Sequence, residues 1–299
     1  GLPLEAGAGT CARPGGAGAV TDGRRDLEAF VRLVEALRPY LDDLVFVGGW
    51  AHFLYTLTPE AAPLGFTPLF TEDADVAAPL RLPVRGRPIP ELLMAAGFEQ
   101  RLTGELTPPV AEYVLGDEDS GFYVEFLAPL IGGELKRDGK PDATTKVGGV
   151  SAQKLRHLDV LLERPWKLEL TEQLGFPVSA PSVIQLPNPA SYIVQKVLVL
   201  GRRHPKSQPK DVLYLHDTFA AFTDAMPIIR RAWEELRPSL HRKHVQAFEE
   251  GVRAVVSTRG DLLRSASLAA AERPRAPTVE TLRLGLRRGF QEGFGIPLE

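Results

Sequence analysis

The sequence has little cysteine and no long hydrophobic run. Its 299 residues contain one cysteine, Cys11, so a disulfide within the chain and a cysteine-based zinc site are both excluded. No stretch approaches the roughly 18 consecutive apolar residues that a membrane-spanning helix needs. We therefore expect a cytoplasmic protein that works in a reducing environment.

Three common ligand-binding motifs are also missing. The chain has no Gly-Lys-Ser/Thr phosphate loop, no Gly-x-Gly-x-x-Gly after a strand, and no Gly-x-Ser-x-Gly elbow. These absences argue against P-loop nucleotidases, dinucleotide-binding enzymes and serine hydrolases of the α/β type. Composition adds little, because 44% hydrophobic and 24% charged residues are ordinary for a globular protein.

Charge is divided unevenly along the chain, although the net charge is only −3. From residue 186 onward there are 18 Lys and Arg against 12 Asp and Glu, a net of +6. The preceding part carries a net of −9. An acidic half followed by a basic half suits a phosphate-rich ligand held between them, although surfaces also vary in charge by chance.

The pattern of elements predicts an α+β fold with a small mixed or antiparallel sheet, flanking helices and a C-terminal helical bundle. We expect a flexible arm over 1–22, an α+β domain over 23–186 and a helical domain over 187–299. Strands are expected at 44–47, 70–77, 98–102, 112–115, 122–126, 166–170 and 183–186. Helices are expected at 24–41, 50–57, 88–96, 152–162, 190–203, 210–223, 226–236, 240–256 and 278–289.

A double glycine, Gly48-Gly49, follows the strand expected at 44–47 and precedes a helix. Glycines at such a turn let the backbone come close to a ligand, and the N–H groups that open the helix favour an anion. A tight strand-to-helix turn without a ligand is the commoner explanation. The glycine pair therefore indicates a ligand site only in combination with the acidic residues that follow it.

Two carboxylates, Asp73 and Asp75, lie two residues apart in the next expected strand. That spacing places both side chains on one face, because side chains of a strand alternate. Adjacent carboxylates raise each other's pKa unless a cation lies between them, and Mg²⁺ is the natural occupant because it prefers oxygen ligands and phosphate partners. The pair points to phosphoryl or nucleotidyl transfer, whereas a solvated strand edge is the simpler alternative.

A third acid, Glu125, lies in the apolar stretch Tyr123–Leu127, where an isolated charge would be costly. On its own it fits an edge strand or a salt bridge. Beside Asp73 and Asp75 it can complete a three-carboxylate metal site that supports attack on an α-phosphate.

The second half of the chain offers opposite charge. Lys196 is the only charge in an apolar helix until its end, and Arg203 lies seven residues on, which predicts a shared face. Lys210 and Asp211 open the next expected helix, where Asp211 favours the N-terminus.

Together these segments resemble the nucleotidyltransferase superfamily with the polymerase-β-like fold. The closer resemblance is to bacterial nucleotidyltransferase-like proteins with a C-terminal helical domain, a group that includes AbiEii-type toxins. It rests on Val47–Ala51, Thr71–Asp75, Val124–Leu127 and the Lys196 helix running into Lys210-Asp211. The sequence departs from the family pattern in a long step between Gly49 and Asp73, and in Tyr214 where toxin relatives often carry a second Asp.

The resemblance implies a role for each candidate residue. Gly48 and Gly49 would cradle the triphosphate; Asp73, Asp75 and Glu125 would be catalytic and bind Mg²⁺; Lys196, Arg203, Lys210 and Asp211 would complete the nucleotide site.

The implied activity is Mg²⁺-dependent transfer of a nucleoside monophosphate from an NTP to an acceptor hydroxyl on RNA such as tRNA, protein or a small molecule, with release of pyrophosphate. The alternative is a non-catalytic nucleotide-binding protein, or a toxin–antitoxin-type regulator with an antitoxin partner.

Overall fold

The computed structural model describes residues 22–66, 69, 71, 73–103, 108–116, 121–257 and 261–298. Residues 1–21, which make up almost all of the expected N-terminal arm and include Cys11, lie outside the described residues. The helical elements in chain order are α1 Asp22–Ala36, α2 Gly48–Tyr55, α3 Ile89–Ala95, α4 Pro189–Leu200, α5 Gln208–Ala221, α6 Met226–Leu236, α7 Arg242–Val256, α8 Asp261–Ala269 and α9 Val279–Phe294. The strands are β1 Val45–Val47, β2 Asp73–Ala77, β3 Glu99–Thr103, β4 Val110–Leu115, β5 Phe122–Pro129, β6 Thr144–Val147, β7 Val150–Leu155, β8 Trp166–Leu170 and β9 Ser182–Leu186.

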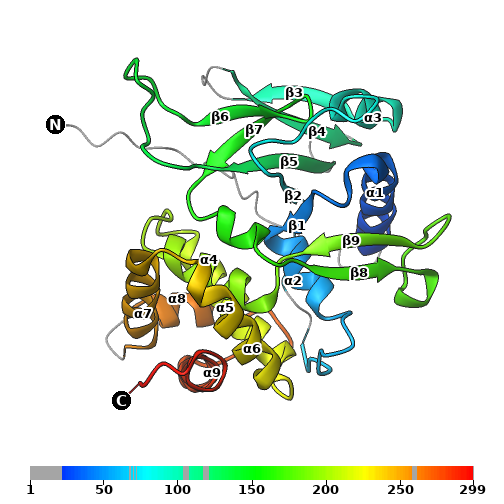
Figure 1. Cartoon of the computed structure of the whole chain (residues 1–299). Coiled ribbons are helices and arrows are strands. Elements are labelled where there is room, and N and C mark those ends of the chain that lie inside the picture. Colours follow the sequence, from blue (N-terminus) through cyan, green and yellow to red (C-terminus); the bar gives the residue numbers. More distant parts are fainter. Residues whose placement is uncertain are drawn as a thin grey trace.

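The described strands form one mixed sheet in the order β3-β4-β5-β2-β1-β9-β8, with the β6–β7 hairpin attached through β5 (Figure 1). β3, β4 and β5 form the expected antiparallel meander. β2 runs antiparallel to β1 and parallel to β5, which places it at the centre of the sheet. The α+β class with C-terminal helices is therefore confirmed, in a sheet larger than the small one expected.

The helix expected at 152–162 is wrong. Residues 150–155 form β7, which pairs in parallel with β5, and a short 3-10 turn follows at Asp159–Leu162. The hairpin partner β6 was not expected at all, although Gly148-Gly149 between the two strands is a sequence signal for a tight hairpin turn. Both glycines have positive φ, +56° and +95°. Helix α8 was also missed.

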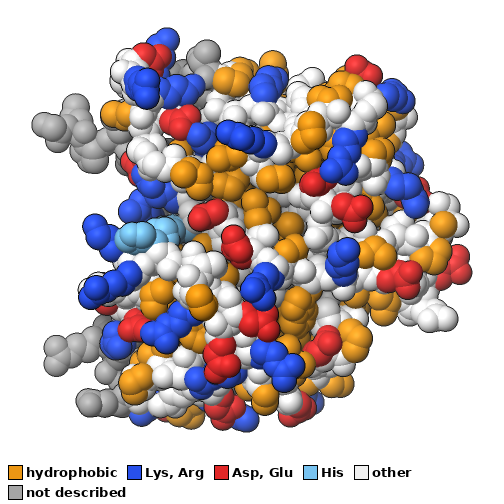
Figure 2. Space-filling model, in the orientation of Figure 1, with side chains coloured by type: hydrophobic (Ala, Val, Ile, Leu, Met, Phe, Trp, Pro, Cys, Tyr) orange, Lys and Arg blue, Asp and Glu red, His pale blue; other side chains and the backbone are white. Residues whose placement is uncertain are grey.

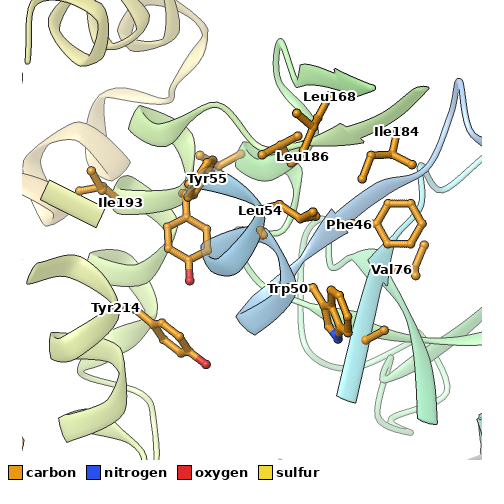
Figure 3. Packing of buried hydrophobic residues seen from close by; sticks show 14 of the residues in the cluster. Phe46, Trp50, Leu54, Tyr55, Val76, Leu168, Ile184, Leu186, Ile193 and Tyr214 are labelled. Atoms are coloured by element: carbon orange, nitrogen blue, oxygen red, sulfur yellow. The ribbon is translucent and has the colours of Figure 1, made fainter. Parts of the chain in front are cut away.

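One hydrophobic cluster extends from α1 through the sheet to α9. Figure 3 shows Trp50, Leu54 and Tyr55 of α2 between strands that carry Phe46 and Ile184 and helices that carry Ile193 and Tyr214. The Trp50 ring stacks on Phe30 at 4.0 Å between centroids. The expected boundary near residue 186 falls where the strands end, and its status as a domain boundary stays a prediction.

Helices α5 and α9 approach closely at Gly289, where an added Cβ would lie 2.3 Å from the Phe219 ring. We expect Gly289→Ala to lower the free energy of unfolding by about 1–3 kcal/mol, because the crowded ring would have to move. Gly201→Ala is the matched control, since nothing lies within 4 Å of the added Cβ there. Urea denaturation of the three proteins measures the effect, and equal midpoints for the two variants would contradict it.

No helix in the described part of the chain is long and apolar enough to cross a membrane.

Candidate active site

Strand β2 presents its two aspartates on the face of the sheet that is turned away from the main core. Ala74 and Val76 are fully buried, while Asp73 and Asp75, which alternate with them, are only partly buried. The alternation arises because side chains of a strand point to opposite faces in turn. The sequence prediction that the two carboxylates share a face is therefore confirmed.

Carboxylates from three neighbouring strands lie in one row. Asp75 pairs in register with Glu125 of β5, and Glu125 pairs with Glu112 of β4. In-register partners project to the same face of a sheet, so the three acids are neighbours on it. Tyr123 is the register partner of Asp73 and lies one step along the same face. The structure thus brings the three predicted acids to one surface and adds a fourth, Glu112.

The double glycine lies directly against this row. β1 ends at Val47, the register partner of Asp75, and α2 begins at Gly48 with φ +65°. A Cβ on Gly48 would lie 2.1 Å from the Asp75 Oδ2 atom, far inside contact distance. Only glycine can therefore provide both the left-handed turn and room for the carboxylate.

Helical side chains secure the turn from the other side. Tyr192 of α4 donates a hydrogen bond from its hydroxyl to the Gly48 carbonyl oxygen at 3.3 Å. A Cβ on Gly49 would lie 2.1 Å from the Thr71 Oγ1 atom and 3.0 Å from the Tyr214 hydroxyl. The turn is thus enclosed by the loop before β2 and by the C-terminal helices α4 and α5.

The acids have strongly raised proton affinities. Burial, followed by the neighbouring Asp73, raises the pKa of Asp75 to about 7, and Lys196, Arg203 and Lys210 act in the opposite direction. Burial, then Asp75 and a hydrogen bond with Glu112 among other acidic neighbours, raises the pKa of Glu125 to about 8. Side-by-side carboxylates that are partly removed from water favour a shared proton or a bound cation.

The predicted cationic residues gather around Asp211. The Lys196 ammonium donates a 2.7 Å hydrogen bond to Asp211 Oδ1, and both side chains are almost completely buried. Arg203 Nε lies 3.4 Å from Asp211 Oδ2. Arg203 lies beyond the end of α4 at Leu200, so the proximity to Lys196 comes from their shared carboxylate rather than from a continuous helix face.

Two tyrosine rings flank Lys196. Its Nζ lies 4.7 Å from the centroid of the Tyr214 ring and 5.6 Å from that of Tyr192. Burial lowers the Lys196 pKa, while the charge of Asp211 opposes that change. The Nζ atom of Lys210 lies 5.7 Å from the centroid of the Tyr214 ring, and Lys210 is exposed. Lys196, Arg203 and Lys210 all act to lower the pKa of Asp75, so their charges lie close enough to influence that carboxylate.

The donor chemistry of this site fits Mg²⁺, which proteins commonly hold through one or two carboxylates together with substrate phosphates. Asp73 and Asp75 supply such a pair beside a glycine turn that admits no side chain. Within the described ranges, no group of three or more His, Cys, Asp or Glu side chains is arranged to hold a metal ion. The metal-binding role of Asp73, Asp75 and Glu125 therefore stays a prediction.

His52 of α2 lies only a few residues after the glycine turn, but its side chain is packed in the interior. Its Nδ1 lies 3.3 Å from Thr218 Oγ1, and its Nε2 lies 3.9 Å from Asp217 Oδ2. Burial lowers the His52 pKa to about 4, although Asp217 opposes the shift. At neutral pH the ring is therefore uncharged, and it serves to pack α2 on α5.

Sequence reasoning missed Glu112 and Tyr192 as parts of this surface, and identified Tyr214 only as a departure from the family pattern. The alternation in Val110–Val114, with one acid among apolar residues, is the same signal that identified Glu125. The tyrosines gave no comparable signal, because an aromatic residue in an apolar helix usually belongs to the core.

Charges of both signs are spread over the face seen in Figure 2. Lys and Arg side chains lie over the sheet as well as over the C-terminal helices, and acidic side chains lie among them. The acidic and basic halves of the sequence therefore do not form separate acidic and basic regions on this face.

Replacing Gly48 tests the turn directly. We expect Gly48→Ala to displace Asp75 and to reduce any activity that depends on it by at least about tenfold, since the two atoms cannot be 2.1 Å apart. Gly86→Ala is a matched control, because its φ of +66° imposes the same backbone strain of about 1–2 kcal/mol with nothing within 4 Å. Comparable losses of activity in both variants at equal stability would show that strain alone is responsible.

Comparison with known protein families identifies the family of this chain. The sequence model of a family described as "Nucleotidyltransferase" matches residues 25–237. The chain is also similar to an antigenic nucleotidyltransferase-like protein of known crystal structure from Paracoccidioides brasiliensis, with 15% identity, a TM-score of 0.39, and coverage of 81% of this chain and 92% of that one. No curated protein matches the chain. Because the family match spans more than half of the sequence and includes the glycine turn, β2, β5 and α5, this chain belongs to the nucleotidyltransferase family.

Proposed function

We propose that this chain transfers a nucleoside monophosphate from an NTP to an acceptor hydroxyl in a Mg²⁺-dependent reaction. The observation that carries the proposal is the placement of Asp75 against the Gly48 turn, beside Asp73 and facing the cations of α4 and α5. Anionic metal ligands, a backbone turn without side chains and basic side chains are together what a metal–triphosphate complex requires.

Each group has a distinct task in this proposal. Asp73 and Asp75 would hold Mg²⁺, which when bound neutralises triphosphate charge. The backbone of Gly48 and Gly49 approaches the phosphates because neither residue has a side chain, and the N–H groups that begin α2 favour their negative charge. Lys210 and Arg203 supply further positive charge, while Lys196 and Asp211 hold α4 and α5 together beneath them.

Glu125 would accept the proton of the acceptor. The acceptor oxygen forms a bond to the α-phosphorus, the bond from that phosphorus to the oxygen bridging to the β-phosphate breaks, and pyrophosphate leaves. The hydroxyl proton passes to a Glu125 carboxylate oxygen. Because burial and Asp75 raise the pKa of Glu125 to about 8, its ionised form is a stronger base than an ordinary carboxylate.

Labelling with each α-³²P NTP in turn tests the proposal. The full chain is incubated with Mg²⁺ and with total RNA, purified tRNA or a protein lysate, and products are separated on a gel. We expect a labelled acceptor with wild type and Asp42→Asn, an exposed control, and none with Asp75→Asn or with EDTA. The labelled class identifies the acceptor.

The same experiment addresses the alternative of a non-catalytic or toxin–antitoxin-type nucleotide-binding protein. That alternative is favoured if wild type binds NTP with Mg²⁺ and labels no acceptor in any extract. If wild type neither binds NTP nor labels an acceptor, both the transferase proposal and this alternative are rejected.

A further inference from the structure

A cavity of about 270 Å³ lies where the loop before β2, helix α5 and the segment between α8 and α9 meet. Its polar walls come from His216, Asp217, Arg273 and Arg275, and Phe66 closes one side. None of the residues predicted for the nucleotide site lines it. Its volume corresponds to roughly nine water molecules at about 30 Å³ each, which is enough for a small organic ligand.

Asp217 organises the floor of this cavity. Its side chain has no exposure, and its two oxygens are taken by different partners: Oδ1 lies 2.9 Å from His216 Nδ1, and Oδ2 accepts a 2.8 Å hydrogen bond from Arg273 Nη1. With Nδ1 engaged in this way, Nε2 is the nitrogen of His216 that is left for another partner. The carboxylate therefore fixes a histidine and an arginine in place.

Arg273 still has unused hydrogen-bonding capacity. Its Nη2 atom is buried and has no hydrogen-bond partner in the part of the chain that the structure describes. Buried guanidinium donors are normally satisfied, so an unmatched one calls for an acceptor. Asp217 accepts from Nη1 of Arg273 and makes no hydrogen bond with Nη2.

Arg275 adds a second positive charge at the rim. It is exposed and holds a left-handed backbone conformation with φ +57°. Its side chain lies against the opposite loop, since a Cβ on Gly65 would be 2.9 Å from Nη1. Two guanidinium groups face one carboxylate around the cavity, which leaves it with an excess of positive charge.

Phe66 supplies a flat apolar wall. Its ring lies 6.4 Å from that of His216, with 31° between the two planes. Aromatic walls of this kind favour a planar ring, and paired arginines favour a phosphoryl group. We propose that this cavity binds a small phosphorylated ligand that carries a planar ring, no larger than a nucleoside monophosphate, separately from the catalytic site.

Calorimetric titration of the full chain in EDTA tests the proposal, with AMP, inorganic phosphate and adenosine as probes. EDTA removes the divalent metal that phosphate binding at Asp73 and Asp75 would require, and the Asp73→Asn/Asp75→Asn variant reports any binding that remains there. We expect saturable 1:1 binding of AMP, at least tenfold weaker binding of phosphate or adenosine alone, and tenfold or greater weakening of AMP binding in Arg275→Gln.

Arg264→Gln on α8 is the matched control, because it removes the same charge from an exposed arginine outside the cavity. Phe66→Leu should weaken AMP but leave phosphate binding unchanged. The proposal is overturned if AMP does not bind in EDTA, if Arg275→Gln and Arg264→Gln bind AMP equally, or if Asp73→Asn/Asp75→Asn alone removes binding. Since binding is the readout, the outcome does not depend on whether the chain has transferase activity.

Discussion

Asp75→Asn is expected to reduce nucleotidyl transfer by at least about 100-fold while leaving the metal-free protein as stable as wild type or more stable. The amide keeps the size of the side chain but removes a metal ligand worth several kcal/mol in the transition state. It also removes the repulsion that, after burial, raises the pKa of Asp75 to about 7. Label transfer and urea denaturation in EDTA measure the two effects.

The same substitution should change how stability depends on pH. In the folded, metal-free chain Asp75 binds a proton up to about pH 7, whereas an ordinary aspartate releases it near 3.8. Between these values the folded state binds more protons than the unfolded state, so the free energy of unfolding falls as pH rises. The fall should be shallower in Asp75→Asn, with Glu125, whose pKa is also raised, responsible for part of what remains. An unchanged slope would show that Asp75 is ionised throughout.

Lys196→Met is expected to lower the free energy of unfolding by about 3–5 kcal/mol. The side chain that it removes is the hydrogen-bonded partner of Asp211, which is only 3% exposed. Breaking a buried pair leaves an uncompensated charge, and this costs more than the pair itself contributes. Arg203, which is one-third exposed and 3.4 Å away, compensates only in part. Denaturation with urea at pH 7 measures the loss.

The double variant Lys196→Met/Asp211→Leu separates packing from function. Removing both charges should recover most of the lost stability, since an apolar pair of similar volume can replace a buried ion pair. If Lys196 also acts on nucleotide phosphates, NTP binding stays weak in the refolded double variant. Full recovery of NTP binding would restrict Lys196 to holding α4 against α5. A Lys196→Met variant that loses less than about 1 kcal/mol would contradict the buried-pair interpretation.

The parts of the site that depend on the local geometry of one strand, turn or helix could be predicted from the sequence. Asp73 and Asp75 share a face because strand geometry requires it, and Gly48-Gly49 marks a turn that glycine alone can make against Asp75. Lys196 stood out as the only charge in an apolar helix; the structure pairs it with Asp211, and its predicted role at the nucleotide phosphates stays a prediction. In these places the local pattern and the fold agree.

Errors arose where long-range pairing overrode the local pattern. Residues 152–155 have apolar spacing that fits a helix, yet they pair with β5. The reason is that residues 127–129 of β5 extend past its pairing with β4 and offer backbone partners that no local pattern reveals. Glu112 has the same local pattern as Glu125, but only strand register places the two side by side. The cavity at Arg273 depends on residues more than 200 positions apart, Phe66 and Arg275, whose proximity comes from helix packing.

The amino-acid sequence alone determined the fold class, the central strand with its two acids, the glycine turn and the buried lysine, since each depends on neighbours within a few positions. Only the tertiary structure decided which charges meet. Asp211 joins Lys196 to Arg203, the carboxylate row extends to Glu112, and Asp217 binds Arg273. The physical reason is that burial and proximity set the energy of a charge, and both are properties of the packed chain rather than of any segment.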